Sequence, residues 1–219
     1  MTDQFAEARD RMVNSQIRPN RVSDPHITSA MRRLPRERFL PAGLAPLAYA
    51  DQDVPLGNGR VLMQPMAIAR LLQIAAPMQG EHALVVAAGA GYGAALLAAC
   101  GPRVTALEED PALLALARQA LTEVAPEVSL VSGSLSAGWP AGAPYDLILL
   151  EGAVTSIPPA LGQQLRNSGG RLVTVVCTDG RTCQAVLAEA TPAGLRAQPM
   201  FDCPTPCLPS LLPAPAFAF

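Results

Sequence analysis

Short apolar stretches alternate with helical patterns between residues 83 and 177, and this alternation restricts the fold more than any other feature of the chain. Helical patterns cover 91–100, 111–124 and 158–166. Strands that alternate with helices favour right-handed crossovers and a parallel sheet with helices on both faces. We therefore expect an α/β fold with a doubly wound, mostly parallel sheet of seven strands. The predicted strands are ALVVA (83–87), RVTAL (103–107), EVSLV (127–131), YDLILL (145–150), RLVTVVC (171–177) and two late stretches at 183–190 and 195–202.

The first 80 residues have a different pattern and are expected to form a helical N-terminal extension, followed by an α/β domain over 81–219. The spacing of apolar residues predicts helices over 3–17 and 64–76 and a third that opens at Ser23-Asp24-Pro25. Residues 41–63 are rich in proline and glycine and are expected to form a long loop. Eight arginines between Arg9 and Arg38 are compatible with an anionic partner. Because acids are interspersed among them, a solvated helical face is the favoured interpretation.

Charge and composition exclude several classes of protein. The net charge of −2 gives no general attraction to nucleic acid or to an anionic membrane. No apolar run approaches the roughly 18 residues of a membrane span. The N-terminal stretch carries acids and no apolar run, so neither a secretion signal nor a mitochondrial presequence is expected. These features predict a soluble cytoplasmic protein.

The cysteines predict neither a disulfide framework nor a metal site. There are five, an odd number without regular spacing, which argues against a secreted disulfide scaffold. Cys203 and Cys207 lie in CPTPC, but the only histidines, His26 and His82, are far away in sequence. We expect ordinary loop or core thiols and no bound metal.

The stretch LVVAAGAGYGAALLA, residues 84–98, has the form of a strand, a tight turn and a helix. At the carboxyl end of such a strand the backbone must approach a ligand closely, and Ala87, Gly89 and Gly91 are small enough to allow it. Glu108 closes the next strand, and its two oxygens match the two hydroxyls of a ribose. The alternative for Glu108 is a solvated carboxylate at a helix start. A nucleotide-like cofactor site is the favoured interpretation.

Motifs along nearly the whole chain resemble the protein-L-isoaspartate O-methyltransferase family, which uses S-adenosyl-L-methionine. The resemblance is weakest in the C-terminal part and most specific over 143–173, with its double proline and GGRLV. The matching stretches are RMVNSQI (11–17), LPRERFLP (34–41), YADQDVPLGNGRVLMQPMAIARLL (49–72), GAGYGAALLA (89–98), VTALEEDPALLALAR (104–118), GSLSAGWP (133–140) and APYDLILLEGAVTSIPPALGQQLRNSGGRLV (143–173).

The resemblance implies an S-adenosyl-L-methionine-dependent methyltransferase that repairs proteins by methylating an L-isoaspartyl carboxylate. The implied partner is therefore a protein or peptide carboxylate, and the oligomeric state is not indicated. A carboxylate is ionised at neutral pH, since its ordinary pKa is near 4, so no general base is needed. The substrate-binding residues it implies are Leu62, Met63, Gln64 and Pro65, and the cofactor-binding residues are Ala87, Gly89, Gly91, Tyr92, Glu108, Ser132, Gly133, Ser134 and Leu135.

Departures from the family pattern cluster at the expected site and leave other functions open. Val85 stands where the family has an acid that helps to hold the methionine ammonium, and Ala87 where it has a glycine. Ser132 replaces an aspartate, and Met63 replaces a hydroxyl residue. Glu151 stands where the family has a small or hydroxyl residue. It either repels an incoming carboxylate, helps to hold the cofactor, or lies in a surface loop.

Three alternatives to carboxyl methylation follow from these departures. The first is a non-catalytic relative that serves as a binding or interaction module. The second is a methyltransferase that acts on a different acceptor, with Glu151 as catalytic base. A nicotinamide-dependent dehydrogenase is the weakest alternative, because a chain without lysine cannot supply a tyrosine–lysine pair.

Overall fold

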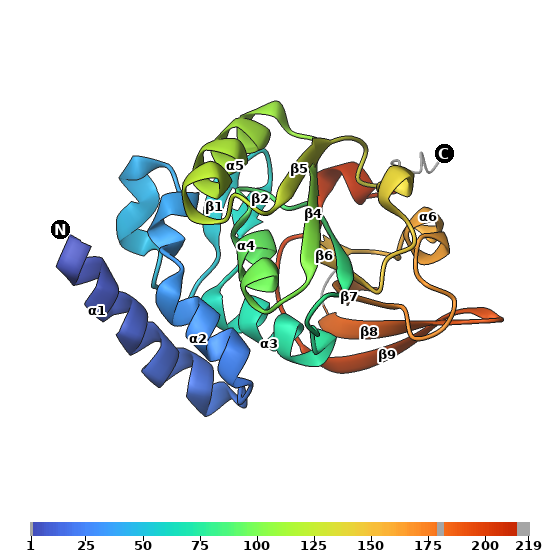
Figure 1. Ribbon diagram of the computed structural model, residues 1–219, viewed down its shortest axis with the longest axis horizontal. Helices are drawn as coiled ribbons and strands as arrows, with labels where there is room; N and C mark the ends of the chain where they lie inside the picture. The colour runs from blue at the N-terminus through green and yellow to red at the C-terminus, as the bar shows by residue number, and fades with distance from the viewer. Residues whose placement is uncertain (1, 179–181, 214–219) are drawn as a thin grey trace, which may run out of the picture.

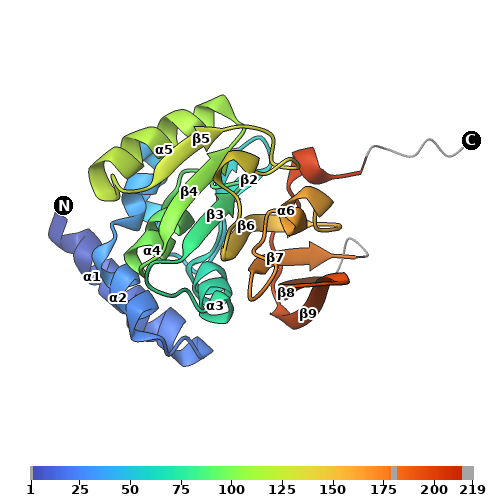
Figure 2. The same ribbon diagram turned by 45° about the vertical axis from the view of Figure 1, so that its right-hand side comes forward.

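The structure is a computed structural model that describes residues 2–178 and 182–213. Its centre is a seven-stranded sheet with the order β5-β4-β3-β6-β7-β8-β9, as Figure 2 shows. Neighbours from β5 to β7 pair in parallel, and β8 and β9 add antiparallel to the edge. The predicted fold class is confirmed. The strands of this sheet are β3 His82–Val86, β4 Arg103–Glu108, β5 Ser129–Ser132, β6 Leu147–Val154, β7 Arg171–Cys177, β8 Cys183–Thr191 and β9 Gly194–Asp202.

Six α-helices accompany the sheet within the described residues. Several begin with proline in the first turn, where its missing N–H costs nothing. α5 also has an N-cap, because the Asp110 side chain accepts hydrogen bonds from the N–H groups of Ala112 and Leu113. The helices are α1 Thr2–Met12, α2 Pro25–Arg33, α3 Pro65–Ala75, α4 Tyr92–Ala99, α5 Pro111–Val124 and α6 Pro159–Gln163.

Alternate residues of the central strands serve two separate apolar cores. Val85 and Leu149 point into the larger one, which also holds buried residues of α2, α3, α4 and α5. Leu84 and Leu150 point to the opposite face, where α6 and the segment around Trp139 cover the sheet. A strand buried on both faces has this continuous apolar character. The alternation fixes the side to which each residue at a strand end points.

The N-terminal extension packs against the α/β part without a core of its own. α1 and α2 lie next to α3 and α4 on the outside of the molecule (Figures 1 and 2). Met12, Val13 and Ile17 belong to the same apolar core as Val85. A turn of π-helix, Val13–Ile17, and a 3-10 turn, Arg18–Asn20, continue α1, so the predicted helix over 3–17 is confirmed. The division at residue 80 remains an interpretation of the sequence.

Three expectations about local structure are wrong. Residues 41–63 are not a plain loop: they contain a 3-10 turn, Ala42–Leu47, and a hairpin of β1 Val54–Gly57 with β2 Arg60–Leu62. The strand predicted over 145–150 ends too early: β6 continues to Val154 and includes Glu151, which excludes the surface-loop alternative for that residue. Cys177 and Cys183 form a disulfide between β7 and β8 instead of remaining free thiols.

Candidate functional site

The turn between β3 and α4 has the backbone conformation that close approach to a ligand requires. Three of its residues have left-handed φ values, +59° at Ala87, +56° at Gly89 and +94° at Gly91. Glycine adopts such a conformation freely, whereas alanine is strained there. The sequence therefore retains the shape of the predicted cofactor turn even at Ala87, where the family glycine is missing.

Glu108 ends β4 beside this turn and is fully buried. Its Oε2 accepts a hydrogen bond from the N–H of Gly89 at 2.7 Å. Its Oε1 accepts from the N–H groups of Glu109 and Asp110 at 2.9 and 3.0 Å. Because backbone donors from the turn and the helix start converge on this carboxylate, Glu108 is not a solvated helix-start acid. It holds the two strand ends together at the expected ribose position.

Arg60, on β2, occupies the side of Glu108 that faces the hairpin. Its Nη1 and Nη2 each donate to one carboxylate oxygen of Glu108 at 2.9 Å, which makes a bidentate ion pair. Nη2 also donates to the carbonyl of Ala87 at 2.9 Å. The hairpin lies directly over the turn, since a Cβ added at Gly89 would lie 3.7 Å from Leu56 Cδ1. Arg60 could not be identified as a site residue from the sequence, because an arginine in a glycine-rich segment looks like a surface residue.

The predicted substrate-loop residues lie between β2 and α3. Leu62 and Met63 are buried. Gln64 is the N-cap residue of α3, and its N–H donates to Asp53 Oδ1 at 2.7 Å, while Pro65 is the first residue of that helix. The loop is therefore held in place by its backbone and by the start of α3, and the Met63 side chain belongs to the apolar core.

The predicted adenine-side residues follow β5, next to the end of β4. Gly133 donates its N–H to the carbonyl of Glu108 at 3.2 Å. Leu135 is buried, and its N–H lies 3.4 Å from Glu109 Oε2. Ser132 and Ser134 are exposed. These four residues therefore lie around the same carboxyl end of the sheet as the cofactor turn.

Val85, which the sequence resemblance places at the position of an ammonium-binding acid, has an apolar environment. It is fully buried in the larger core. Losing a charged hydrogen bond costs about 1.5–3 kcal/mol, which is about a ten- to hundredfold loss of affinity. Val85 therefore offers no charged partner to an ammonium group.

Glu151 lies beside the cofactor turn, because Leu150 pairs with Val86 and Glu151 is the next residue along β6. The residue is partly exposed, but its Oε1 is shielded from solvent and has no hydrogen-bond partner. Burial of the carboxyl raises its pKa to about 8; the charge of Glu108 adds to this rise, while Arg60 and Arg36 oppose it. Glu151 therefore carries its proton at neutral pH, and the expected repulsion of a carboxylate does not apply in that state.

Arg36 is a further buried polar residue that could not be identified from the sequence. It is completely buried in the 3-10 turn Arg36–Phe39. Its Nε donates to the carbonyl of Ala48 at 2.7 Å, and its Nη2 to that of Met63 at 2.5 Å. Its guanidinium carbon lies 4.7 Å from the centre of the Tyr92 ring. The solvated arginine face expected between Arg9 and Arg38 is therefore wrong for Arg36.

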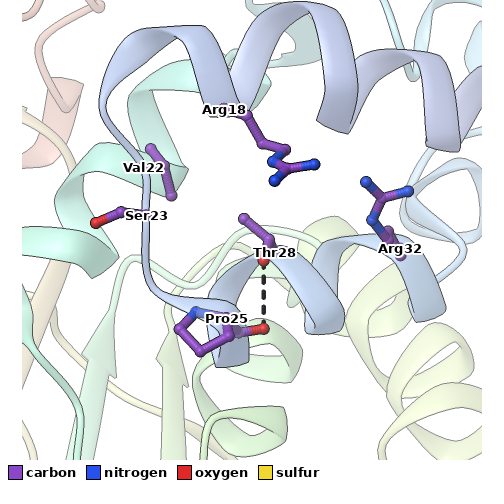
Figure 3. A pocket seen from close by; sticks show the side chains of 6 residues that line it. All are labelled: Arg18, Val22, Ser23, Pro25, Thr28 and Arg32. Atoms are coloured by element: carbon purple, nitrogen blue, oxygen red, sulfur yellow. Dashed lines mark hydrogen bonds between the residues drawn. The ribbon is translucent and has the colours of Figure 1, made fainter.

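A surface pocket lies elsewhere, in the N-terminal extension. Figure 3 shows the side chains of Arg18 and Arg32 pointing toward one another above Thr28. Arg32 is already engaged there, because it donates to Asp10 at 2.9 Å and to Asn14 at 2.6 Å. The pocket is lined only by residues between Arg18 and Arg32 and is separate from the cofactor turn.

Residues 2–178 and 182–213 also bear on two other classes of site, metal clusters and membrane-spanning helices. No group of three or more His, Cys, Asp or Glu side chains there is arranged to hold a metal ion. In the same part of the chain, every helix is too short or too polar to cross a membrane.

Comparison with known proteins agrees with this geometry. The sequence model of the family described as Protein-L-isoaspartate(D-aspartate) O-methyltransferase (PCMT) matches residues 7–193. A protein-L-isoaspartate O-methyltransferase of Methylorubrum extorquens is 41% identical over 177 residues, which cover 81% of this chain and 78% of the relative. One from Syntrophobacter fumaroxidans is 35% identical over 195 residues, covering 88% of this chain and 89% of the relative.

Solved structures show the same fold at lower sequence identity. A protein-L-isoaspartate O-methyltransferase superposes with a TM-score of 0.79 at 22% identity, over 93% of this chain and 67% of the other. A putative enzyme of that name from Plasmodium falciparum, in complex with S-adenosyl-L-homocysteine, gives 0.78 at 17% identity, over 94% and 98%. The likeness in fold, together with the match over residues 7–193, places the chain in the protein-L-isoaspartate O-methyltransferase family.

Proposed function

We propose that this protein transfers the methyl group of S-adenosyl-L-methionine to the carboxylate of an L-isoaspartyl residue in a protein or peptide. The observation that carries the proposal is the buried carboxylate of Glu108, held by the N–H groups of Gly89, Glu109 and Asp110 at the carboxyl end of β4. Ligands of doubly wound sheets bind at this edge. Membership of the family supports the substrate class.

The residues present fit the cofactor, provided that the ribose replaces Arg60 on Glu108. Three left-handed residues open the turn, and Glu108 offers two oxygens to a diol. In this proposal Glu108 holds the ribose, the backbone of 87–91 lies along the cofactor, and Ser132, Gly133, Ser134 and Leu135 border the adenine. When bound, the cofactor supplies an electrophilic methyl group on a sulfonium. The protein's contribution is to position the acceptor in line with that group, since no proton has to be removed from a carboxylate.

Radiolabelled methyl transfer to a synthetic isoaspartyl peptide tests this function. We expect a base-labile methyl ester on the isoaspartyl peptide and none on its aspartyl isomer. The variant Glu108→Ala removes the ribose contact and should abolish transfer. Glu123→Ala is the matched control, because this acid on α5 forms only an exposed ion pair with Arg38. Absence of any ester with wild-type protein, despite S-adenosyl-L-homocysteine binding measured by calorimetry, would defeat the proposal.

A second candidate is methyl transfer to a neutral hydroxyl or amine. The observation in its favour is the pKa of Glu151, raised to about 8, which suits a general base at that pH. Transfer to such an acceptor should be lost in Glu151→Gln. The cytoplasmic location expected from the sequence remains a prediction for either candidate.

A further inference from the structure

One peptide unit of the substrate loop, residues 62–65, is held on both sides by charged side chains. It joins Met63 to Gln64, immediately before α3. Its carbonyl oxygen accepts a hydrogen bond from Nη2 of Arg36 at 2.5 Å. Its N–H donates to Oδ1 of Asp53 at 2.7 Å. Hydrogen bonds to ionised groups are shorter and stronger than those between neutral groups. The orientation of this peptide unit is therefore set by two residues from outside the loop.

Thr205 holds the other oxygen of the Asp53 carboxylate. Its hydroxyl donates to Oδ2 at 3.1 Å, across 152 residues of sequence. Thr205 itself is buried. Burial raises the pKa of Asp53. Hydrogen bonds from Gln64 and Thr205 oppose that rise, and so does the nearby charge of Arg36. The Thr205 hydroxyl therefore favours the ionised form of Asp53 and fixes the orientation of its carboxylate.

The C-terminal segment over residues 203–211 is attached to the end of β6. The carbonyl of Pro206 accepts a hydrogen bond from the N–H of Ala153 at 3.1 Å, and the N–H of Leu208 donates to the Ala153 carbonyl at 2.8 Å. Ala153 also pairs with Val175 of β7, so the segment lies on the other side of β6, where β3 has already ended. It is therefore fixed to the edge of the sheet at which the cofactor is proposed to bind.

Side-chain packing on two elements holds the same segment in place. Leu208 is buried, and a Cβ added at Gly152 of β6 would lie 2.8 Å from its Cδ2. A Cβ added at Gly59, between β1 and β2, would lie 2.8 Å from Pro209 Cγ. The end of the segment is therefore close to the start of β2, as Figure 2 shows. Because it is packed against both β6 and the hairpin, the segment is a firm support for the residues that it contacts.

We propose that Thr205 and Asp53 are positioning residues, which set the place of the substrate loop relative to the end of β6. This inference rests on the proposed function. The contacts run from Ala153 of β6 to Pro206, from the neighbouring Thr205 to Asp53, and from Asp53 to the N–H of Gln64. Methyl transfer needs the acceptor in line with the methyl group, and a small misplacement costs much of the rate. Thr205 and Asp53 act on the acceptor through the loop and do not have to touch it.

Thr205→Val tests this support, because it removes the hydroxyl and keeps the shape of the side chain. With saturating S-adenosyl-L-methionine and isoaspartyl peptide, we expect kcat to fall about tenfold, while the calorimetric Kd for S-adenosyl-L-homocysteine is unchanged. Thr205→Ser keeps the hydroxyl and should restore kcat. Thr191→Val is the matched control, since it also removes one hydrogen bond, to the Gly194 carbonyl at 2.7 Å between β8 and β9. Its kcat should equal that of the wild type.

A double-mutant cycle tests whether Thr205 acts through Asp53. Asp53→Ala removes the carboxylate and should lower kcat at least as much as Thr205→Val. Adding Thr205→Val to Asp53→Ala should have no further effect, because the hydroxyl then has no carboxylate to hold. Three results would each overturn the proposal: an unchanged kcat in Thr205→Val, no recovery in Thr205→Ser, or independent losses that multiply in the double variant.

Amide hydrogen exchange, which needs no turnover, separates failure of this support from failure of the proposed function. The N–H of Gln64 should exchange about tenfold faster in Thr205→Val than in the wild type or in Thr205→Ser. The N–H of Gly89, which donates to Glu108 at 2.7 Å, should keep its rate and so show that the change is local. If the wild type forms no methyl ester but Gln64 responds in this way, the support of the loop stands and the proposed function alone fails. Equal Gln64 rates in all three proteins would overturn the support of the loop, whatever the activity.

Discussion

In the proposed cofactor site, a bound ribose would need the same two carboxylate oxygens of Glu108 that Arg60 occupies. Without ligand, the bidentate pair and the bond to Ala87 hold the β1–β2 hairpin against the cofactor turn. Cofactor binding in the proposed mode would have to break a buried ion pair whose partners are 8% and 0% exposed. The contact would then lower the apparent affinity for the cofactor by the free energy needed to release Arg60.

Replacing Arg60 by alanine should tighten cofactor binding while destabilising the protein. We expect the calorimetric Kd for S-adenosyl-L-homocysteine to fall about tenfold, and the free energy of unfolding in urea to fall by about 3 kcal/mol, because Glu108 loses its buried counter-ion. Arg171→Ala is the control, since Arg171 pairs with the buried Glu81 away from the turn. It should destabilise without changing the Kd. Weaker cofactor binding in Arg60→Ala would show that Arg60 contacts the ligand instead.

Glu151 should make the stability of the protein depend on pH. Its pKa is about 8 in the folded protein and near the ordinary value of 4.5 in the unfolded chain. As the pH rises, the unfolded chain therefore releases this proton before the folded protein does. The contribution of Glu151 to stability is complete below pH 4.5 and is lost as the pH rises through 8. Glu151→Gln should be more stable than the wild type at pH 8.5 by at least about 2 kcal/mol, with a smaller difference at pH 5.5. Equal differences in urea midpoints at the two pH values would contradict this.

At the scale of elements, the β3–α4 turn holds a residue in a strained backbone conformation. Ala87 has a φ of +59° and is buried between β3 and Gly89. Ala87→Gly should therefore raise the free energy of unfolding by about 1 kcal/mol, because glycine adopts this conformation without strain. Ala90→Gly, in the same turn but without a left-handed φ, should not stabilise the protein. Thermal unfolding of the three proteins measures the difference, and a lower Tm for Ala87→Gly would contradict the strain.

Most elements could be predicted from the sequence because their patterns are local. The strand at 171–177 and the helix at 111–124 were predicted with the bounds that the structure shows. The β1–β2 hairpin could not be predicted, since Pro55, Gly57 and Gly59 weaken a strand pattern and its stability comes from Arg60 contacting the turn. The end of β6 was placed too early, because Glu151 and Gly152 interrupt the apolar run.

The residues of the candidate site fall into the same two groups, those set by the local sequence pattern and those set by distant contacts. Ala87, Gly89, Gly91 and Glu108 could be predicted because turn and strand end are set by neighbouring residues. Arg36 and Arg60 could not, because each contacts residues far along the chain: Met63 is 27 residues from Arg36, and Glu108 is 48 from Arg60. A charged residue in a polar segment gives no sign of burial when its partner is so distant.

At the scale of the whole molecule, the extension and the sheet share one apolar core. Ile17 and Phe39 from the first 80 residues belong to the same cluster as Val85 and Val175. The substrate loop belongs to the first 80 residues, whereas the cofactor turn belongs to the part of the chain that follows. Their relative positions therefore depend on that core, and we expect the chain to unfold in one cooperative transition.

Ile17→Ala tests this cooperativity, because Ile17 is fully buried in the extension and far in sequence from the sheet. Truncation leaves a cavity and should cost about 2–5 kcal/mol of unfolding free energy. Trp139, the only tryptophan, lies against the opposite core and reports on the far face of the sheet. With a single transition, the urea midpoint seen by Trp139 fluorescence falls as far as the midpoint seen by circular dichroism. If the fluorescence midpoint stayed at its wild-type value, the extension would be a separate folding unit, and the contact between Arg60 and Glu108 would join two independent parts.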